Sequence, residues 1–280
     1  DFHPEIFANF CLCLFFCGKI NSLLMIFDSI VYGPIHSRRL GISLGMNLFP
    51  TDGKLCTFDC IYCECGYNKD HRPHEKMPCR EEVREALARK LDEMRADGKV
   101  PDVITFAGNG EPTMHPDFAG IIDDTIAIRD QHCPSAKIAV LSNSTMLGKE
   151  DVFQALCKIE DNIMKLDSVL DKRIRQINVP NQPGFCFDEL LKNLCRFDGK
   201  VIIQTMFLHG ESNGEPVDNL SEEEISGWIE ALKQIRPKQV MIYTIDRATP
   251  LQTLRKATKD ELDAIAARAR GEGFDVTVSY

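Results

Sequence analysis

The sequence has no apolar run long enough to cross a membrane and no long basic segment. The apolar stretch near its start, residues 6–17, is about a dozen residues long, whereas a bilayer span needs about 20. The start also lacks the basic residues and the small-residue cleavage site of a signal peptide. The 42 Asp and Glu residues outnumber the 33 Lys and Arg residues, leaving a formal charge of −9. Because polyanion binding needs clustered Lys and Arg, this balance argues against a nucleic-acid surface.

Internal repeats and low-complexity tracts are also missing, and the composition of 44% hydrophobic and 27% charged residues is that of a globular protein. A chain of 280 residues can bury a substantial core as one domain. Disulfide-dense scaffolds are short and secreted, so the 12 cysteines indicate reduced thiols and a cytoplasmic protein. Four isolated cysteines are expected to be small buried hydrophobes: Cys133, Cys157, Cys186 and Cys195.

Residues 1–24 do not match the pattern that follows them. The sequence begins at Asp1, and Met25 directly precedes the first orderly segment. We therefore expect a core domain over residues 25–280 and interpret residues 1–24 as a leader upstream of a natural start at Met25. A second metal site built from Cys11, Cys13 and Cys17 is disfavoured because no fourth ligand is evident.

From residue 26 onward, strand patterns alternate with helix patterns. Strands are predicted at residues 42–49, 102–107, 137–141, 163–166, 201–207, 240–245 and 274–278. Helices are predicted at 80–97, 118–128, 151–157 and 187–194, and behind two capping boxes, Ser221 with Glu224 and Thr258 with Glu261. Repeated βα units predict an α/β fold with a parallel sheet, either open or curled into a barrel. Both architectures place ligand-binding residues at the carboxyl ends of the strands.

The strongest chemical signal is the segment CTFDCIYCEC, residues 56–65. Cys56, Cys60 and Cys63 follow a CxxxCxxC spacing, which lets three thiolates converge on one inorganic cluster and leaves one metal position free. Cys65 is expected to lie beside the cluster without binding it, since the spaced ligand pairs of a zinc site are missing. Two alternatives remain open: Cys65 completes a closed electron-transfer cluster, or it joins Cys79, His71 or His74 around zinc.

The CxxxCxxC spacing, with Tyr62 before the third cysteine, resembles the signature of the radical S-adenosylmethionine (radical SAM) superfamily. The segments GNGEPT and KLDS look most like its branch of Fe–S oxidoreductases related to tRNA-wyosine synthases. The resemblance implies a partial (βα)6 TIM-like barrel, a [4Fe–4S] cluster on Cys56, Cys60 and Cys63, and SAM on the open iron. It also implies an enzyme that reductively cleaves SAM to a 5′-deoxyadenosyl radical, which abstracts hydrogen from a substrate. An electron-transfer or metal-binding protein without SAM cleavage is the alternative.

The same resemblance implies partners and contact residues. The electron donor would be a flavodoxin or ferredoxin, and the substrate a small molecule, a peptide or a tRNA. Tyr62 would contact the adenine, the 108–111 segment would hold the SAM amino group, and the segment after residue 141 would contact the ribose and carboxylate. The residues concerned are Tyr62, Gly108, Asn109, Gly110, Glu111, Ser142 and Asn143.

Lys165 and Asp167 flank Leu166, so strand alternation turns both to the same face. They form either a buried salt bridge or a contact to the substrate or the SAM carboxylate. Further candidates for site contacts are Gln204, Asp246 and Arg247, and the pair Arg38 and Arg39 as an anion contact.

Overall fold

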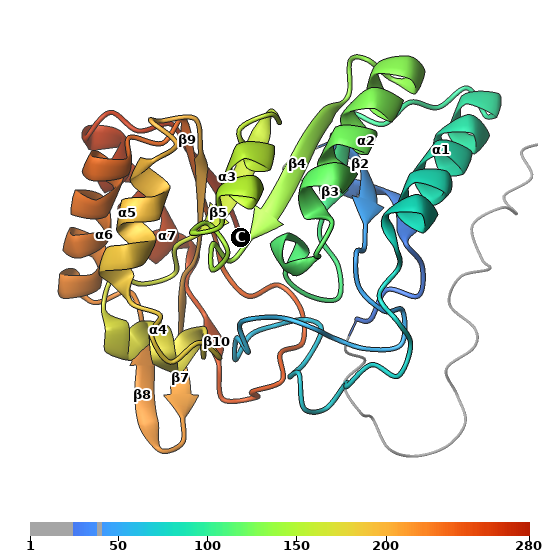
Figure 1. Ribbon diagram of the computed structural model, residues 1–280. Helices are drawn as coiled ribbons and strands as arrows, with labels where there is room; N and C mark the ends of the chain where they lie inside the picture. The colour runs from blue at the N-terminus through green and yellow to red at the C-terminus, as the bar shows by residue number, and fades with distance from the viewer. Residues whose placement is uncertain (1–24, 38–40) are drawn as a thin grey trace, which may run out of the picture.

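The computed structural model describes residues 25–37 and 41–280, so the predictions for Arg38, Arg39 and residues 1–24 lie outside the described residues. Most of the described chain folds into βα units around one long sheet (Figure 1). The strands are β1 (Val31–Ser37), β2 (Gly41–Met46), β3 (Val103–Phe106), β4 (Lys137–Ser142), β5 (Asp161–Lys165), β6 (Ile202–Met206), β7 (Leu208–Ser212), β8 (Glu215–Asp218), β9 (Gln239–Tyr243), β10 (Arg255–Lys256) and β11 (Val276–Ser279). The helices are α1 (Arg80–Ala96), η1 (Pro112–Met114), α2 (Phe118–His132), α3 (Glu150–Leu156), α4 (Asp171–Ile177), α5 (Phe187–Cys195), α6 (Glu222–Ile235) and α7 (Lys259–Gly271).

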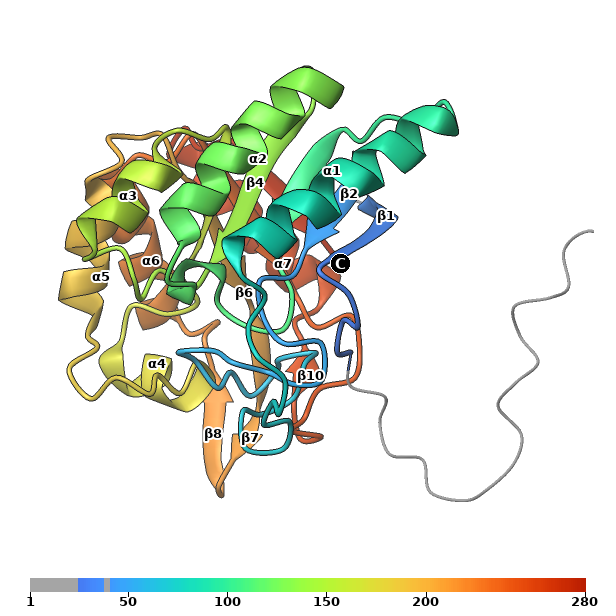
Figure 2. The ribbon, with the colours of Figure 1, turned by 45° about the vertical axis from the view of Figure 1, so that its right-hand side comes forward.

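The long sheet has the strand order β1-β2-β3-β4-β5-β6-β9-β11. Every neighbouring pair from β2 to β11 is parallel, and only β1 runs antiparallel, against β2. The helices cover the outer face (Figures 1 and 2). The two sheet edges approach each other, since Ile35 and His36 of β1 line one cavity together with Ser279 of β11 and Tyr280 after it. The sheet is therefore curled into an incomplete barrel.

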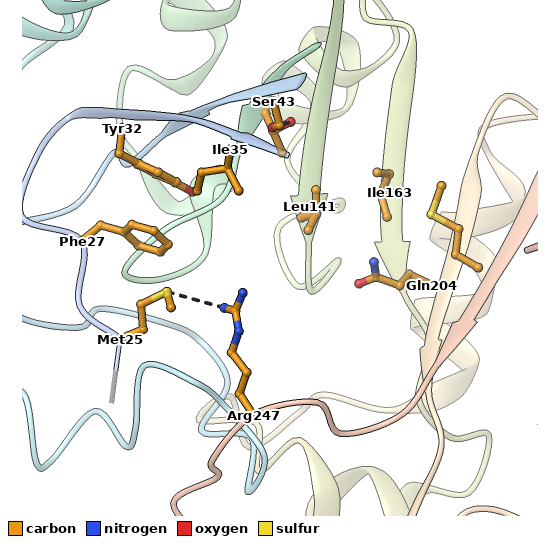
Figure 3. A pocket seen from close by; sticks show the side chains of 11 residues that line it. Met25, Phe27, Tyr32, Ile35, Ser43, Leu141, Ile163, Gln204 and Arg247 are labelled. Atoms are coloured by element: carbon orange, nitrogen blue, oxygen red, sulfur yellow. Dashed lines mark hydrogen bonds between the residues drawn. The ribbon is translucent and has the colours of Figure 1, made fainter. Parts of the chain in front are cut away.

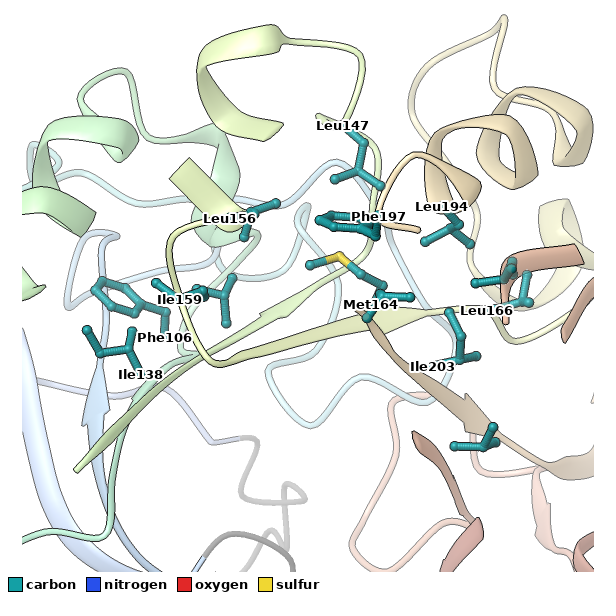
Figure 4. Packing of buried hydrophobic residues seen from close by; sticks show 14 of the residues in the cluster. Phe106, Ile138, Leu147, Leu156, Ile159, Met164, Leu166, Leu194, Phe197 and Ile203 are labelled. Atoms are coloured by element: carbon teal, nitrogen blue, oxygen red, sulfur yellow. The ribbon is translucent and has the colours of Figure 1, made fainter. Parts of the chain in front are cut away.

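Alternation along the strands divides the core into two layers. Outward-facing side chains such as Phe106, Ile138, Met164 and Ile203 pack against the helices in the large cluster of Figure 4. Inward-facing side chains form a smaller apolar layer inside the barrel: Val103, Ala139, Ile163, Ile202 and Met241. Because most of these residues lie in the first half of their strands, the layer fills the amino-terminal end of the barrel and leaves the carboxyl end for the site.

Several elements differ from the prediction. The strand predicted at 42–49 ends at Met46 because the Asn47 side chain bonds both the N–H and the carbonyl of Phe49 and turns the chain. The β7–β8 hairpin was not predicted, although its Asn213–Gly214 turn, with both residues at positive φ, is a strong hairpin signal. The β1 strand, the short helix α4 and the strand β10 were also missed.

Two capping predictions had different outcomes. Thr258 and Glu261 form the predicted capping box at α7. At α6 the Ser221 side chain caps the helix, but the Glu224 carboxylate binds Ser168 and the Val169 N–H instead of closing the box.

The prediction for the isolated cysteines was largely wrong. Cys133 is buried, whereas Cys186 and Cys195 are partly exposed and Cys157 is exposed. The last three lie in or next to the short helices α3 and α5 at the surface, where helix faces alternate between core and solvent. All nine cysteines in the described part of the chain are free. No helix among the described residues is long and apolar enough to cross a membrane.

Candidate cluster and cofactor site

The segment between β2 and α1, residues 47–79, crosses the carboxyl ends of the strands and carries the cysteines (Figure 1). It is anchored at two sides. The Leu55 N–H donates to the Asn109 carbonyl at 2.8 Å, and the Ile61 N–H donates to the Ile177 carbonyl at 3.0 Å. Between these anchors, the Cys63 N–H closes a turn on the Cys60 carbonyl at 3.1 Å. The loop therefore holds its thiols against the barrel mouth.

Two of the three cysteine sulfurs accept a hydrogen bond from an amide on another element. Asn143 Nδ2 lies 3.6 Å from Cys56 Sγ, and Asn178 Nδ2 lies 3.5 Å from Cys60 Sγ. Amide donors of this kind stabilise negative charge on a sulfur ligand. Neither amide is close in sequence to the cysteine that it contacts, so the fold brings these partners together.

Lys54 supplies positive charge to the same loop. Its side chain is 1% exposed, and its ammonium donates to the Gly66 carbonyl and to Asp59 at 3.2 Å. Burial alone would lower the pKa of Lys54, but the thiols of Cys63, Cys56 and Cys60, together with Asp59, raise it above the ordinary value. A buried ammonium facing three thiols suits an anionic cluster, because three thiolates bring a net negative charge into the loop. The donor set thus fits a [4Fe–4S] group.

The thiols differ in their environments. Burial raises the pKa of Cys60 to about 11 and raises that of Cys56 further. The Cys65 thiol and, against the effect of burial, the Lys54 ammonium lower the pKa of Cys63 below its ordinary value. Cys65 Sγ also lies 3.6 Å from the Gly108 carbonyl. Cys65 therefore contacts both the cysteine triplet and the GNGEPT segment.

The zinc alternative finds no support in the arrangement. Among residues 25–37 and 41–280, no group of three or more His, Cys, Asp or Glu side chains is placed to hold one metal ion. In a cluster each thiolate binds a different iron, so a cluster site does not require the sulfurs to meet at a single point. The grouping of Cys65 with Cys79, His71 or His74 is accordingly not formed.

The GNGEPT segment follows β3 and lies under the cysteine loop. A Cβ at Gly110 would come within 1.7 Å of the Leu55 carbonyl oxygen, so only glycine permits this approach. The Asn109 side chain is fully buried and bonds the Phe27 N–H, the Phe27 carbonyl and the Pro50 carbonyl. Its own N–H and carbonyl bond Asn47 and Leu55. The hydrogen-bonding groups of Asn109 are thus engaged within the protein.

Glu111 joins the GNGEPT segment to the SNST segment, which follows β4. Its buried carboxylate accepts from Ser142 Oγ at 2.8 Å, from the Asn143 N–H at 2.6 Å and from the Thr113 N–H at 3.1 Å. Burial raises the pKa of Glu111, and these donors oppose the rise. Next to them, Ser144 has a left-handed φ of 69° and a buried hydroxyl without a partner in the described part of the chain. An orphaned hydroxyl at this position fits a site that takes a polar cofactor.

Lys165 and Asp167 share one face, as predicted, and enclose Tyr62. The Asp167 carboxylate accepts from the Tyr62 hydroxyl and from Asn178 Nδ2 at 2.7 Å, and lies 3.6 Å from the Lys165 ammonium. Lys165 also reaches the hydroxyls of Tyr62 and Tyr243, at 2.8 and 3.3 Å. Burial would lower the pKa of Lys165, but Asp167 raises it, so the ammonium stays charged.

The remaining candidates lie on two different parts of the chain: Gln204 is in β6, and Asp246 and Arg247 are in the loop between β9 and β10. Arg247 Nη1 donates to Glu64 Oε2 at 2.6 Å, and Gln204 points into the barrel. Sequence reasoning missed Lys54, Asn178 and Tyr243. The position of Lys54 two residues before the first cysteine was a usable signal, whereas Asn178 and Tyr243 carry none in their local sequence.

Residues 52–221 match the family model described as the radical SAM superfamily. The chain belongs to the radical SAM superfamily. This confirms the predicted family, and because the members of the superfamily are enzymes it also confirms the prediction of an enzyme.

Curated relatives of this radical SAM protein include two UPF0026 proteins. The one from Methanocaldococcus jannaschii is 30% identical over 222 residues, which cover 77% of this chain and 63% of that protein. The one from Helicobacter pylori is 29% identical over 237 residues, covering 83% of this chain and 71% of that protein. The chain thus spans less than two thirds of the length of the first of these relatives.

Solved structures share the fold. A radical SAM methyltransferase from Sphaerobacter thermophilus superimposes with a TM-score of 0.61 at 13% identity, covering 85% of this chain and 66% of that one. TYW1 with a lysine–pyruvate adduct bound gives a TM-score of 0.56 at 16% identity, covering 82% and 73%. The partial TIM-like barrel of the radical SAM type, predicted from the sequence, is confirmed.

Proposed function

We propose that the chain binds a [4Fe–4S] cluster through Cys56, Cys60 and Cys63 and holds SAM beside it. When both are bound, one-electron cleavage of SAM supplies a 5′-deoxyadenosyl radical for hydrogen abstraction from the substrate. The reducing electron would come from a flavodoxin or ferredoxin. We assign the site to a core of residues 25–280, without residues 1–24, in a cytoplasmic protein with reduced thiols.

One observation carries this proposal: the cysteine loop, the GNGEPT segment and the SNST segment form one connected unit. Leu55 bonds Asn109, Cys65 contacts Gly108, and Asn143 contacts Cys56. A closed electron-transfer cluster would need the cysteines but would have no use for glycine-rich and hydroxyl-bearing segments fastened to them. The connection therefore favours a cluster that works with a second cofactor.

The side chains divide into two groups by what they do. Glu111 and Asn109 hold the segments in place, since their polar groups bind other protein groups. We assign the SAM contacts to the backbone of Gly108 and Gly110 and to the free hydroxyl of Ser144. Ser142 and Asn143 lie beside them, but they also bond Glu111 and Cys56, so they would contact SAM while holding the segment. Asp167 and Lys165 orient Tyr62, whose ring we place against the adenine.

The proposal is tested by anaerobic reconstitution with iron and sulfide, reduction with dithionite and addition of SAM. Formation of 5′-deoxyadenosine is expected. Cys63→Ala should lose both iron and SAM cleavage, whereas Cys157→Ala, at an exposed position, should keep both. Cys65→Ala should keep its iron if the cluster has three protein ligands and lose it if the cluster is closed. An intact cluster that never cleaves SAM would reject the proposed function.

A further inference from the structure

The barrel encloses a cavity of about 200 Å³ between the N-terminal segment and the inner face of the sheet (Figure 3). Leu141, Ile163 and Met241 form its wall on the strand side, and Phe27 and Ile35 form the opposite wall. An apolar cavity of about 150 Å³ is enough to hold a benzene molecule. The space therefore suits a molecule of about one ring with one or two substituents, which excludes a folded peptide or an RNA strand from its interior.

Of Ser43, Thr105 and Gln204, the three uncharged polar side chains that line this cavity in the described part of the chain, Gln204 alone has hydrogen-bonding capacity left for a bound molecule. Gln204 is 6% exposed, and its amide has no hydrogen-bond partner among the described residues. By contrast, Ser43 and Thr105 bond each other at 2.8 Å and are satisfied. Because Gln204 lines the cavity, its amide can bond water there, and a bound molecule can take the place of that water. Gln204 thus marks a polar contact point for a bound molecule.

Arg247 carries the only charge among the described residues that line this cavity. One nitrogen of its guanidinium binds Glu64, which stands between Cys63 and Cys65, and the same nitrogen approaches the sulfur of Met25. Its other N–H groups make no hydrogen bond within the described part of the chain. The guanidinium fork matches a carboxylate geometrically. An anion held there would lie beside the cysteine loop.

The surroundings of Arg247 limit the charge of that anion. A second cavity of about 280 Å³ shares Ile35 and Arg247 with the first and is lined by Glu64 and Asp246. It includes the exposed Tyr280, so it offers a path to the surface. The Glu64 carboxylate already pairs with Arg247 at 2.6 Å, whereas Asp246 pairs with Lys256 at 3.9 Å, so little positive charge is left for a doubly charged group. A carboxylate is therefore favoured over a phosphate.

We infer that the substrate is a small monocarboxylate, an inference that rests on the proposed function. Its carboxylate binds Arg247, a polar group binds Gln204, and its apolar body packs against Leu141, Ile163 and Met241. This arrangement places the molecule inside the barrel, next to the loop that carries the cluster.

The test measures binding by calorimetry on the iron-loaded protein with SAM present. The probes are benzoate and phenylacetate, each compared with the corresponding uncharged amide, and phenylphosphonate. Added SAM keeps the probes out of the SAM site. At least one acid should bind more tightly than its amide by about tenfold, the value expected for one hydrogen bond to a charged group. Arg247→Gln should remove this preference, and Gln204→Leu should weaken binding several-fold. Arg95→Gln, an exposed change on α1, should leave binding unchanged.

Acids that bind no better than their amides, or an unaltered preference in Arg247→Gln, would overturn the inference. Tighter binding of phenylphosphonate than of both acids would overturn the choice of a carboxylate. The same preparation is assayed for 5′-deoxyadenosine without any probe. Cleavage without acid binding defeats only the substrate assignment, whereas acid binding without cleavage defeats the proposed function.

Discussion

Replacing Asp167 with alanine is expected to destabilise the folded protein by about 4 kcal/mol. The carboxylate has no exposed surface, pairs with the Lys165 ammonium at 3.6 Å and accepts from the Met206 N–H at 2.9 Å. Its removal leaves the Lys165 ammonium, on a side chain that is 18% exposed, without a counter-charge, which costs up to about 3–5 kcal/mol. It also removes the acceptor of Asn178 and of the Tyr62 hydroxyl. Urea unfolding followed by circular dichroism measures the loss.

Two comparisons separate this effect from a general loss of charge. Asp123→Ala breaks a half-exposed pair with Lys158 and should cost less than about 1 kcal/mol. Lys165→Met combined with Asp167→Ala should be less destabilising than the sum of the single changes by about 1–3 kcal/mol, since no unpaired ammonium remains. A cost for Asp167→Ala near that of Asp123→Ala, or strictly additive single changes, would refute the reasoning.

Three further predictions concern other parts of the structure. Asn178→Leu removes the amide donor to the Cys60 sulfur and should lower the midpoint potential of the cluster by about 40 mV in an EPR-monitored redox titration; an unchanged potential would argue against the contact. Gly110→Ala should displace the cysteine loop, costing about 2 kcal/mol or more in unfolding free energy and lowering the iron content, whereas Gly184→Ala meets nothing within 4 Å and should cause neither change. Burial raises the pKa of Glu224, so the stability linked to its protonated form is complete below the unfolded-state pKa and is lost as pH rises through the folded-state pKa. The melting temperature of Glu224→Gln, measured against that of the wild type, should therefore be higher at about pH 7 than at about pH 4. A difference between the two melting temperatures that does not change with pH would contradict the burial effect.

The βα alternation could be predicted because each parallel strand is a short run buried on both faces. Val103–Phe106 is fully buried and reads VITF, a run of β-branched and aromatic residues in which Thr105 is the one polar residue. The same logic selected the candidate site, since the glycine-rich and polar segments follow such strands. It failed at β1, whose Gly33–Pro34 pair and irregular pairing hide the strand pattern.

The cysteine triplet could be identified from spacing, but its environment could not. Asn178 contacts Cys60 across 118 residues of sequence, and its position between α4 and α5 has no motif. Lys54 would ordinarily be taken for a solvated loop residue, and only the packing of the loop shows that its ammonium is buried among the thiols. Long-range contacts of this kind are set by the fold and leave no local pattern.

The wall of the cavity formed by residues 25–35 is attached mainly through its main chain. Asn109 bonds the N–H and the carbonyl of Phe27, and the Met25 N–H bonds the Glu64 carbonyl at 2.8 Å. A segment fixed in this way can exchange its side chains while keeping its course. Substitutions at Met25, Phe27 or Ile35 can therefore change the shape of the cavity without moving the loop that carries the cysteines.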